Sequence, residues 1–173
     1  MNLDELVIRN ATKKDINEVA NLHVNSFYRT YKNIINQSYL DNMKNNLDNR
    51  IERMQKEFHL RKMVVATLNN EIVAFTEFVF SNEFSKEIDI DCELCGLYVK
   101  NEYIKNGIGT RLFDYVKNEF IKENKKKMGL WCVKENNSAI NFYKNKGGKQ
   151  VREKTFALGG KEYSEVLFIY DLK

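Results

Sequence analysis

Proline is absent from this chain of 173 residues. Together with the abundance of Lys, Asn and Ile, its absence indicates a compositional bias and carries no functional information. No apolar run approaches the ~20 residues that a membrane-spanning helix needs, and residues 1–10 lack the apolar core of a signal peptide. We therefore predict a cytoplasmic protein with no membrane partner.

Cysteine and histidine are scarce, with three Cys and two His residues. An odd number of cysteines without a secretion signal favours a reducing compartment. Cys92 and Cys95 have the spacing of a metal-binding or redox pair, but they fall in a predicted strand, and no second pair accompanies them. His23 and His59 are distant in sequence. We expect core or strand cysteines and no bound metal.

The net charge is also small, because 28 basic and 24 acidic residues leave only +4. A nucleic-acid-binding domain would need a concentrated basic face. The one basic run, residues 122–127, is typical of a solvated helix end, where cations are favourable. We expect no nucleic-acid partner, and the length predicts a single domain over residues 1–173.

What the chain does contain is concentrated in residues 93–120. An apolar, β-prone run over 94–99 predicts a buried strand, and residues 105–109 form a glycine-containing turn. An amphipathic helix follows from Ile108. The first N–H groups of a helix have no intrahelical acceptor, and Gly107 and Gly109 let a ligand approach the backbone, which suits a phosphate or pyrophosphate. A tight turn without a ligand would produce the same short pattern, and neither a Walker nor a dinucleotide motif is present.

The rest of the chain predicts an α+β (mixed α/β) domain. We expect a mostly antiparallel sheet of about seven strands with helices on both faces, in which the strands before and after the glycine-turn helix are parallel. Strands are predicted at 7–8, 63–68, 71–80, 88–99, 128–133, 150–158 and 162–172, and helices at 12–31, 34–62 with a break near 45–49, 108–121 and 139–146. Two hairpin turns are expected, at Asn69-Asn70 and Gly159-Gly160.

Two motifs together resemble the GNAT N-acetyltransferase superfamily. Gly107-x-Gly109 is similar to the motif that grips the pyrophosphate of acetyl-CoA there, although Ile104 stands where that family has Gln or Arg. The second pattern, N-x-x-A-x-x-x-Y-x-x-x-G, is matched by the residues Asn136, Ala139, Tyr143 and Gly147. The resemblance implies the GNAT fold, in which the fourth and fifth strands splay apart and the cofactor's pantetheine lies in the gap.

The resemblance also implies a set of site residues. Acetyl-CoA would be the acyl donor and no metal would be needed. A backbone amide of the fourth strand would polarise the thioester carbonyl, the glycine turn would hold the pyrophosphate, and Asn136 would lie near the pantetheine arm. The cofactor-binding residues implied are Leu97, Tyr98, Val99, Lys105, Asn106, Gly107, Ile108, Gly109, Thr110, Asn136, Ala139 and Tyr143.

Two residues are candidates for proton transfer. The resemblance gives Tyr143 the role of a general acid that protonates the departing thiolate, and the alternative is a packed aromatic on a helix face. Glu93 stands on the fourth strand, where some family members carry a general base. A carboxylate can take the proton of an alkylammonium group if burial raises its pKa. The alternative for Glu93 is an ordinary strand-surface carboxylate.

The acceptor is less well defined. Acidic residues crowd the entry to the fourth strand and would attract a cationic amine, unless they are only a solvated loop: Glu83, Glu87, Asp89 and Asp91. Four aromatic residues either form an apolar wall for the acceptor or are ordinary core residues: Phe27, Tyr28, Tyr31 and Trp131. We predict transfer of an acetyl group to a primary amine of a small molecule, by an enzyme that the resemblance allows to be a homodimer. An acyl-CoA-sensing domain without turnover and a peptide or protein N-acetyltransferase are the alternatives.

Overall fold

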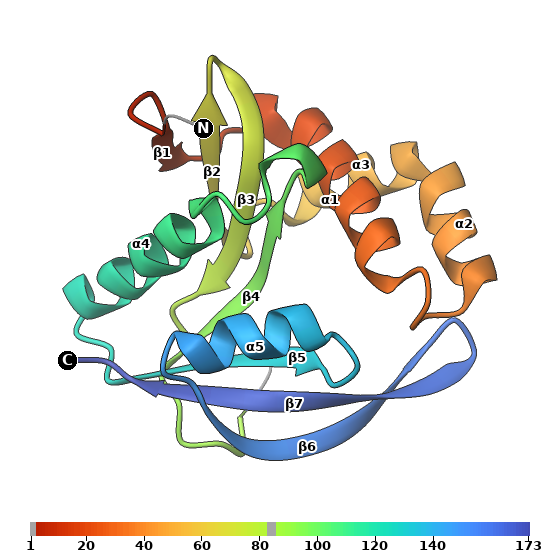
Figure 1. Cartoon of the computed structure of the whole chain (residues 1–173). Helices are drawn as coiled ribbons and strands as arrows, with labels where there is room; N and C mark the ends of the chain where they lie inside the picture. Colours follow the sequence, from red (N-terminus) through yellow and green to blue (C-terminus); the bar gives the residue numbers. More distant parts are fainter. Residues whose placement is uncertain (1–2, 83–85) are drawn as a thin grey trace.

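The computed structural model describes residues 3–82 and 86–173, and its centre is one sheet of seven strands (Figure 1). The strands are β1 (Val7–Asn10), β2 (Lys62–Leu68), β3 (Glu71–Val79), β4 (Cys92–Val99), β5 (Lys127–Val133), β6 (Lys149–Leu158) and β7 (Lys161–Asp171). They lie in the order β1-β2-β3-β4-β5-β7-β6. Only β4 and β5 are parallel; every other neighbouring pair is antiparallel. The predicted fold class is confirmed.

Helices cover both faces of this sheet (Figure 1). They are α1 (Ile16–Tyr31), α2 (Gln37–Asn45), α3 (Leu47–Glu57), α4 (Ile108–Lys122) and α5 (Asn137–Asn145), with short 3-10 turns at Lys13–Asp15 and Asn101–Tyr103. The predicted break in the second helical region is real, because α2 ends and α3 begins at Asn46. One face of β1–β4 packs against α1 and α3, and α4 and α5 cover the opposite face.

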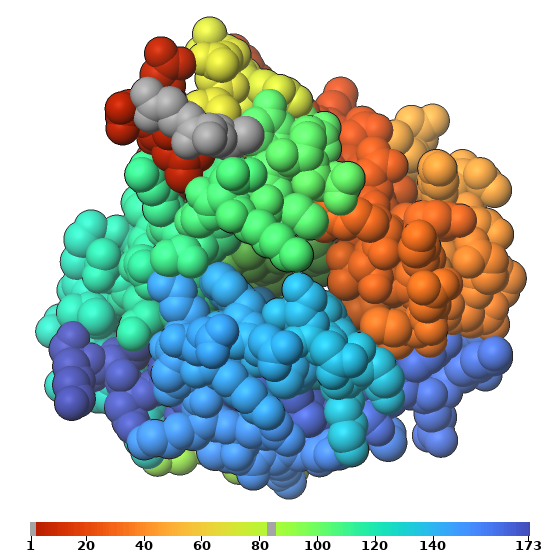
Figure 2. Space-filling view, in the orientation of Figure 1, coloured from red at the N-terminus to blue at the C-terminus, as the bar shows by residue number. Residues whose placement is uncertain are grey.

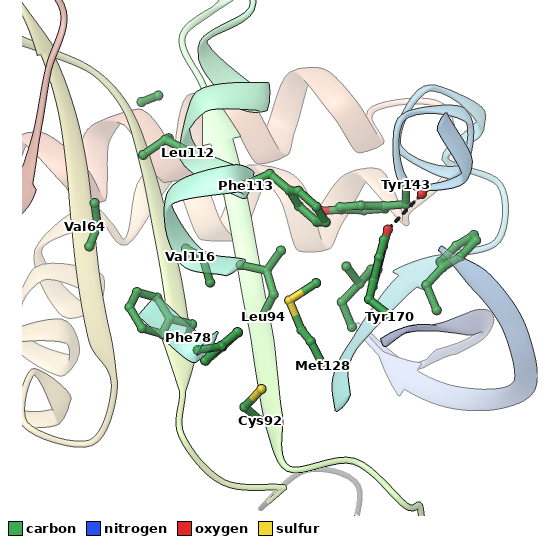
Figure 3. Close-up of a cluster of buried hydrophobic side chains, with 14 of the residues drawn as sticks. Val64, Phe78, Cys92, Leu94, Leu112, Phe113, Val116, Met128, Tyr143 and Tyr170 are labelled. Carbon is green, nitrogen blue, oxygen red and sulfur yellow. Dashed lines mark hydrogen bonds between the residues drawn. The ribbon is translucent and has the colours of Figure 1, made fainter. Parts of the chain in front are cut away.

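The core behind α4 shows why this helix forms where it does. Its apolar positions recur at helical spacing, and Leu112, Phe113, Val116 and Phe120 are each at most 1% exposed. In Figure 3 Val116 of α4 lies beside Leu94, whereas Phe113 points towards Tyr143 and Tyr170. Burying an apolar side chain of this size contributes about 1.5–3 kcal/mol, so packing rather than propensity holds α4 in place and fixes the turn that precedes it.

The predicted hairpins are confirmed by their backbone angles. Asn69 and Asn70 have φ values of 50° and 64°, and Gly159 and Gly160 have 59° and 76°. Two successive residues of positive φ are what a two-residue turn needs to match the right-handed twist of its strands.

The start of the fourth strand is a correction. The sequence predicted that it begins at Ile88, but β4 begins at Cys92. Ile90 is buried without being in a strand, and it packs over Gly129, where an added Cβ would lie 2.5 Å from its Cδ1. Asp89 forms an ion pair with Lys127, and the Asp91 carboxylate accepts the Lys127 backbone N–H. These bonds anchor the segment to β5 and leave it outside the ladder.

The two halves of the sheet separate between β4 and β5. Only Cys92–Met128 and Glu93–Gly129 are in register; beyond them the strands diverge. A bulge lies next to this point, since Glu77 is opposite Gly96 and Phe78 is opposite Leu94, so that β4 has one extra residue, Cys95, between these two pairs. Bulges bend a strand and increase its twist. The bulge at Cys95 therefore directs the end of β4 away from β5.

The α1–α2 connection and the β6–β7 hairpin meet at the open end of this gap. The Asn36 backbone N–H donates to the Tyr163 hydroxyl at 2.8 Å, and Asn36 Nδ2 donates to the Gly159 carbonyl at 3.4 Å. Tyr39 of α2 lies directly over Gly159, where any Cβ would come within 2.7 Å of the tyrosine Cβ. Figure 1 shows the hairpin tip reaching this connection. We call this junction the latch.

Candidate active site

The turn before α4 leaves the start of the helix uncovered by side chains. Gly107 is the N-cap of α4 with φ 84°, and Lys105 also has a positive φ of 60°. No side chain caps α4, and its first acidic residue does not come within the first turn. The first three N–H groups of an α-helix have no intrahelical acceptor. This helix start is therefore electropositive and accessible, the arrangement that binds anionic groups.

The shape of the turn fits a diphosphate. A Cβ added at Gly107 would meet no atom within 4 Å, so the space beside it is open. A Cβ at Gly109 would lie 3.5 Å from Leu97, 3.8 Å from Val99 and 4.0 Å from Phe142. Gly109 thus faces the gap between β4 and α5. The two glycines expose backbone on both sides of the helix start, and Figure 2 shows the surface hollowed where the segment after β4 meets α5 and α1.

The other predicted turn residues contribute in different ways. Ile108 is 1% exposed and belongs to the core, so only its backbone is available to a ligand. Lys105 is exposed, Thr110 is half-buried, and Asn106 Nδ2 donates to the Ile104 carbonyl at 3.1 Å. Arg111 donates to the Leu3 carbonyl at 3.1 Å and is thereby committed to the N-terminal segment. Lys105 remains the flanking cation at the turn.

The β4 side of the gap is formed by Leu97, Tyr98 and Val99. These residues pair with β3 on one edge. On the other edge, within the described residues, the pairing of β4 with β5 stops at Glu93. Backbone groups directed at the gap therefore lack a strand partner. Such groups can polarise a carbonyl bound there.

The Tyr98 side chain turns back over its own strand. A Cβ at Gly96 would lie 2.8 Å from the Tyr98 ring, so only glycine leaves room for it. The ring stacks on Phe75 with centroids 5.1 Å apart, and His23 meets it edge-on at 4.7 Å. Burial raises the pKa of Tyr98 far above its ordinary value, so the phenol is neutral.

Tyr143 lies on α5 in an aromatic surrounding. It is 9% exposed, and its ring centroid is 5.3 Å from Phe142, 6.0 Å from Phe168 and 6.2 Å from Phe113 (Figure 3). The Tyr170 hydroxyl donates to the Tyr143 carbonyl at 2.8 Å and fixes the backbone there. Burial raises the pKa of Tyr143 well above its usual value, and the nearby Cys132 thiol and the phenol of Tyr31 act in the same direction.

Three tyrosines lie near enough to Cys132 for the thiol to influence their pKa values, and we call Tyr31, Tyr98, Tyr143 and Cys132 the tyrosine cluster. The Tyr98 phenol is influenced by Tyr31 and Cys132, and the Tyr143 phenol by Cys132, Tyr31 and Tyr98. These side chains come from α1, β4, β5 and α5 and surround the gap. Burial raises the pKa of Tyr31 and of Cys132 to about 12, so both are protonated at neutral pH. The sequence predicted a core or strand cysteine at Cys132, and an apolar wall or ordinary core packing for Tyr31.

Asn136 joins this cluster to α5. Its side-chain oxygen accepts the Ala139 backbone N–H at 3.2 Å and caps the helix, while its Nδ2 donates to the Tyr31 hydroxyl at 3.5 Å. Ala139 is half-buried and packs against the α4 core. The Asn and Ala of the second motif thus shape the start of α5 and orient Tyr31. That bond connects Tyr31 to the second motif, and only the structure shows it.

Glu93 lies at the closed end of the gap and is 3% exposed. Cys92 and Leu94 belong to the core behind α4, so Glu93 points to the other face, where Tyr98 also packs. Glu93 is four positions before Leu97 on the strand, which is about 13 Å at ~3.3 Å per residue. The structure therefore buries this carboxylate but places it far along β4 from the residues beside the open gap.

His23 of α1 is buried beside the site. It is 7% exposed and packs against Phe27, Phe75 and Tyr98. Its Nδ1 has no hydrogen-bond partner in the described part of the chain. Burial, and then the charge of Arg50, lower its pKa to about 3.

Two of the four acidic residues near β4 bind groups at the start of β5. Asp89 pairs with Lys127, and Asp91 accepts backbone N–H groups. Glu87 is exposed, and Glu83 lies outside the described residues. Over residues 3–82 and 86–173 there is no group of three His, Cys, Asp or Glu side chains that could hold a metal ion, and no helix is long and apolar enough to cross a membrane.

Comparison with known proteins was made by sequence and by structure. A curated relative, the uncharacterized N-acetyltransferase YuaI of Bacillus subtilis, is 27% identical over 161 residues, covering 93% of this chain and 90% of the relative. The PaiA N-acetyltransferase of Thermoplasma acidophilum, solved with coenzyme A, superposes with a TM-score of 0.74 at 17% identity, over 96% of this chain and 98% of that one. YncA of Salmonella typhimurium, a putative acetyltransferase solved with acetyl-CoA, gives 0.69 at 16% identity, over 98% and 95%.

The solved structures establish the fold, and the family follows from the sequence. The acetyltransferase (GNAT) family matches residues 17–147, which span α1 to the end of α5 and include both glycines of the turn and Tyr143. The expectation of an acyltransferase is thereby confirmed. The chain belongs to the acetyltransferase (GNAT) family.

Proposed function

We propose that this protein transfers the acetyl group of acetyl-CoA to a primary amine of a small molecule, by direct attack within a ternary complex. The observation that carries the proposal is the side-chain-free start of α4 at the open end of the β4–β5 gap. Gly107 and Gly109 leave space for the diphosphate, and Lys105 adds positive charge beside it. Acetyl-CoA is the acyl donor, and it supplies a thioester whose carbonyl carbon the amine attacks.

The polar groups around the gap fit this reaction. The Leu97–Val99 edge, which has no strand partner on the β5 side, donates backbone hydrogen bonds to the carbonyl oxygen, on which negative charge develops. The new C–N bond forms as the C–S bond breaks, and the amine gives up one proton. Tyr143, kept protonated by its burial, gives a proton to the departing sulfur. Catalysis by Tyr143 is part of the proposal.

Glu93 is the proposed acceptor of the amine proton. Glu93 is 3% exposed, so its carboxylate is shielded from bulk water. Because it lies about 13 Å along β4 from Leu97, the proton reaches it through water rather than by direct contact.

A small acceptor is favoured by the latch. The α1–α2 connection is bonded to the β6–β7 hairpin through Asn36, Tyr163 and Gly159. This junction closes the acceptor side of the gap at one end. A long peptide crossing the site would have to break it, whereas a small amine would not.

The test follows free thiol while the purified protein is mixed with acetyl-CoA and a panel of polyamines, amino acids, aminoglycosides and short peptides. Thiol release with a small amine supports the proposal. Release with peptides alone would show a peptide or protein N-acetyltransferase. Acetyl-CoA binding with no thiol release for any amine would show an acyl-CoA-sensing domain.

A further inference from the structure

An ammonium group of the protein itself lies against an aromatic ring and a carboxylate on the β5–β7–β6 part of the sheet. Lys154 Nζ lies 3.9 Å from the centroid of the Trp131 ring and 3.2 Å from Glu165 Oε1. Lys154 is opposite Glu165 in the β6–β7 register, and Glu165 is opposite Val133, two residues from Trp131 on β5. All three side chains therefore share one face of the sheet.

Glu165 also lies close to the tyrosine cluster. Val133, which is opposite Glu165, accepts the Asn136 backbone N–H at 3.0 Å, and Asn136 Nδ2 donates to the Tyr31 hydroxyl. The charge of Glu165 contributes to the raised pKa values of both Tyr31 and Cys132. The Cys132 side chain itself belongs to the core behind α4, on the other face of β5 from Trp131. Glu165 and the start of α5 therefore connect Trp131 and Lys154 to the groups around the β4–β5 gap.

The three partners differ in how firmly they are held. The Glu165 side chain is 19% exposed and Trp131 is half-buried, whereas the Lys154 side chain is 42% exposed and sits on the edge strand β6. An exposed lysine loses side-chain entropy when it is held in one place, and such ion pairs contribute little to stability. Lys154 is therefore an occupant that a second ammonium group can displace.

We propose that Trp131 and Glu165 form a cation subsite for the acceptor, that Lys154 occupies it in the free enzyme, and that the preferred acceptor carries a second ammonium group. A tryptophan face and a carboxylate are a combination that recognises alkylammonium ions. The acceptor then binds with one amine at the thioester and the other in place of Lys154. The identification of the ligand as an acceptor rests on the proposed function, but binding at the subsite can be tested without turnover.

The chain has a single tryptophan, so its fluorescence reports on this subsite directly. Diaminopentane is titrated against pentylamine, which has the same chain length and only one ammonium group. We expect diaminopentane to change Trp131 emission saturably and pentylamine to bind at least about tenfold more weakly. Glu165→Gln should weaken diaminopentane binding about tenfold, and Lys154→Met should strengthen it severalfold because the internal competitor is gone.

Lys149→Met is the matched control. Lys149 lies on the same strand but pairs with Asp171 at 3.0 Å, so its loss should leave diaminopentane binding unchanged. Equal responses to the diamine and the monoamine, or a diamine affinity unaffected by Glu165→Gln and Lys154→Met, would overturn the subsite.

Thiol-release assays with acetyl-CoA separate the two proposals. Turnover of amines without preference for the diamine would leave the proposed function standing and refute the subsite. Saturable, Glu165-dependent diamine binding with no turnover of any amine would support the subsite and refute the proposed function. If both hold, the KM for diaminopentane should fall in Lys154→Met and rise in Glu165→Gln, while the KM for pentylamine stays within about twofold in both.

Discussion

Replacing Gly107 with glutamate tests the donor site against an internal control. Gly107 and Gly147 have nearly the same backbone angle, φ 84° and 86°, and neither has an atom within 4 Å of an added Cβ. One begins α4, whereas the other follows the end of α5. Both substitutions should therefore impose the same backbone strain, and only Gly107→Glu should place a carboxylate beside the proposed diphosphate site.

The magnitudes follow from these positions. A side chain in the left-handed region costs about 1–2 kcal/mol, which for a chain of this length lowers Tm by about 2–8 °C in both variants. A carboxylate ~4 Å from a phosphate adds about 1 kcal/mol of repulsion in bulk water and about 4 kcal/mol at an effective dielectric constant of 20. The Kd for acetyl-CoA should therefore rise about 5-fold to 10³-fold in Gly107→Glu alone.

Calorimetric titration with acetyl-CoA and thermal unfolding of both variants measure these two quantities separately. Gly107→Ala adds the backbone strain without the charge and should lie between wild type and Gly107→Glu in Kd. Unchanged affinity in Gly107→Glu, or equal losses in Gly107→Glu and Gly147→Glu, would refute the assignment of the α4 start to the diphosphate.

Three further predictions concern single titratable side chains. Tyr143→Phe should lower kcat by about 10²-fold or more while acetyl-CoA affinity is kept, the usual scale for loss of a general acid; a wild-type kcat in the thiol assay would return Tyr143 to a packing role. Glu93→Gln should remove the acidic limb of the pH–rate profile, and an identical profile would identify another base. His23 is neutral in the folded state, with a pKa of about 3 against 6.5 unfolded, so the unfolded chain binds the extra proton and stability falls as pH falls through that window. Between pH 7 and pH 5 the loss is about 2 kcal/mol, which urea unfolding should show in wild type and not in His23→Gln.

The hairpin turns and the glycine turn before α4 could be predicted from the sequence, because the conformation of a turn depends on neighbouring residues alone. Asn69 and Asn70 adopt the positive φ values expected of them, and Gly147 ends α5 in the left-handed conformation. The predicted start of β4 at Ile88 was wrong because an apolar residue can be buried without pairing in a sheet. Ile90 is such a residue, and the backbone hydrogen bond from Asp91 to Lys127 holds its segment beside β5.

The tyrosine cluster could not be predicted in the same way. Tyr31 and Cys132 come from elements about a hundred positions apart, and no periodicity connects them. The bulge at Cys95, which turns the end of β4, also leaves no mark in the hydrophobic pattern. The role of Glu165 was not predicted, because the sequence of β7 does not distinguish a partly buried carboxylate from one on the surface.

The latch also has an evolutionary corollary. Asn36 and Tyr163 are 127 positions apart and are joined by one hydrogen bond. An insertion or deletion in only one of the two segments would therefore break that bond. New acceptors would therefore have to be acquired by paired changes, in the connection after α1 and in the β6–β7 hairpin together. Libraries that diversify both segments at once should yield altered acceptor preference more often than libraries that vary either one alone.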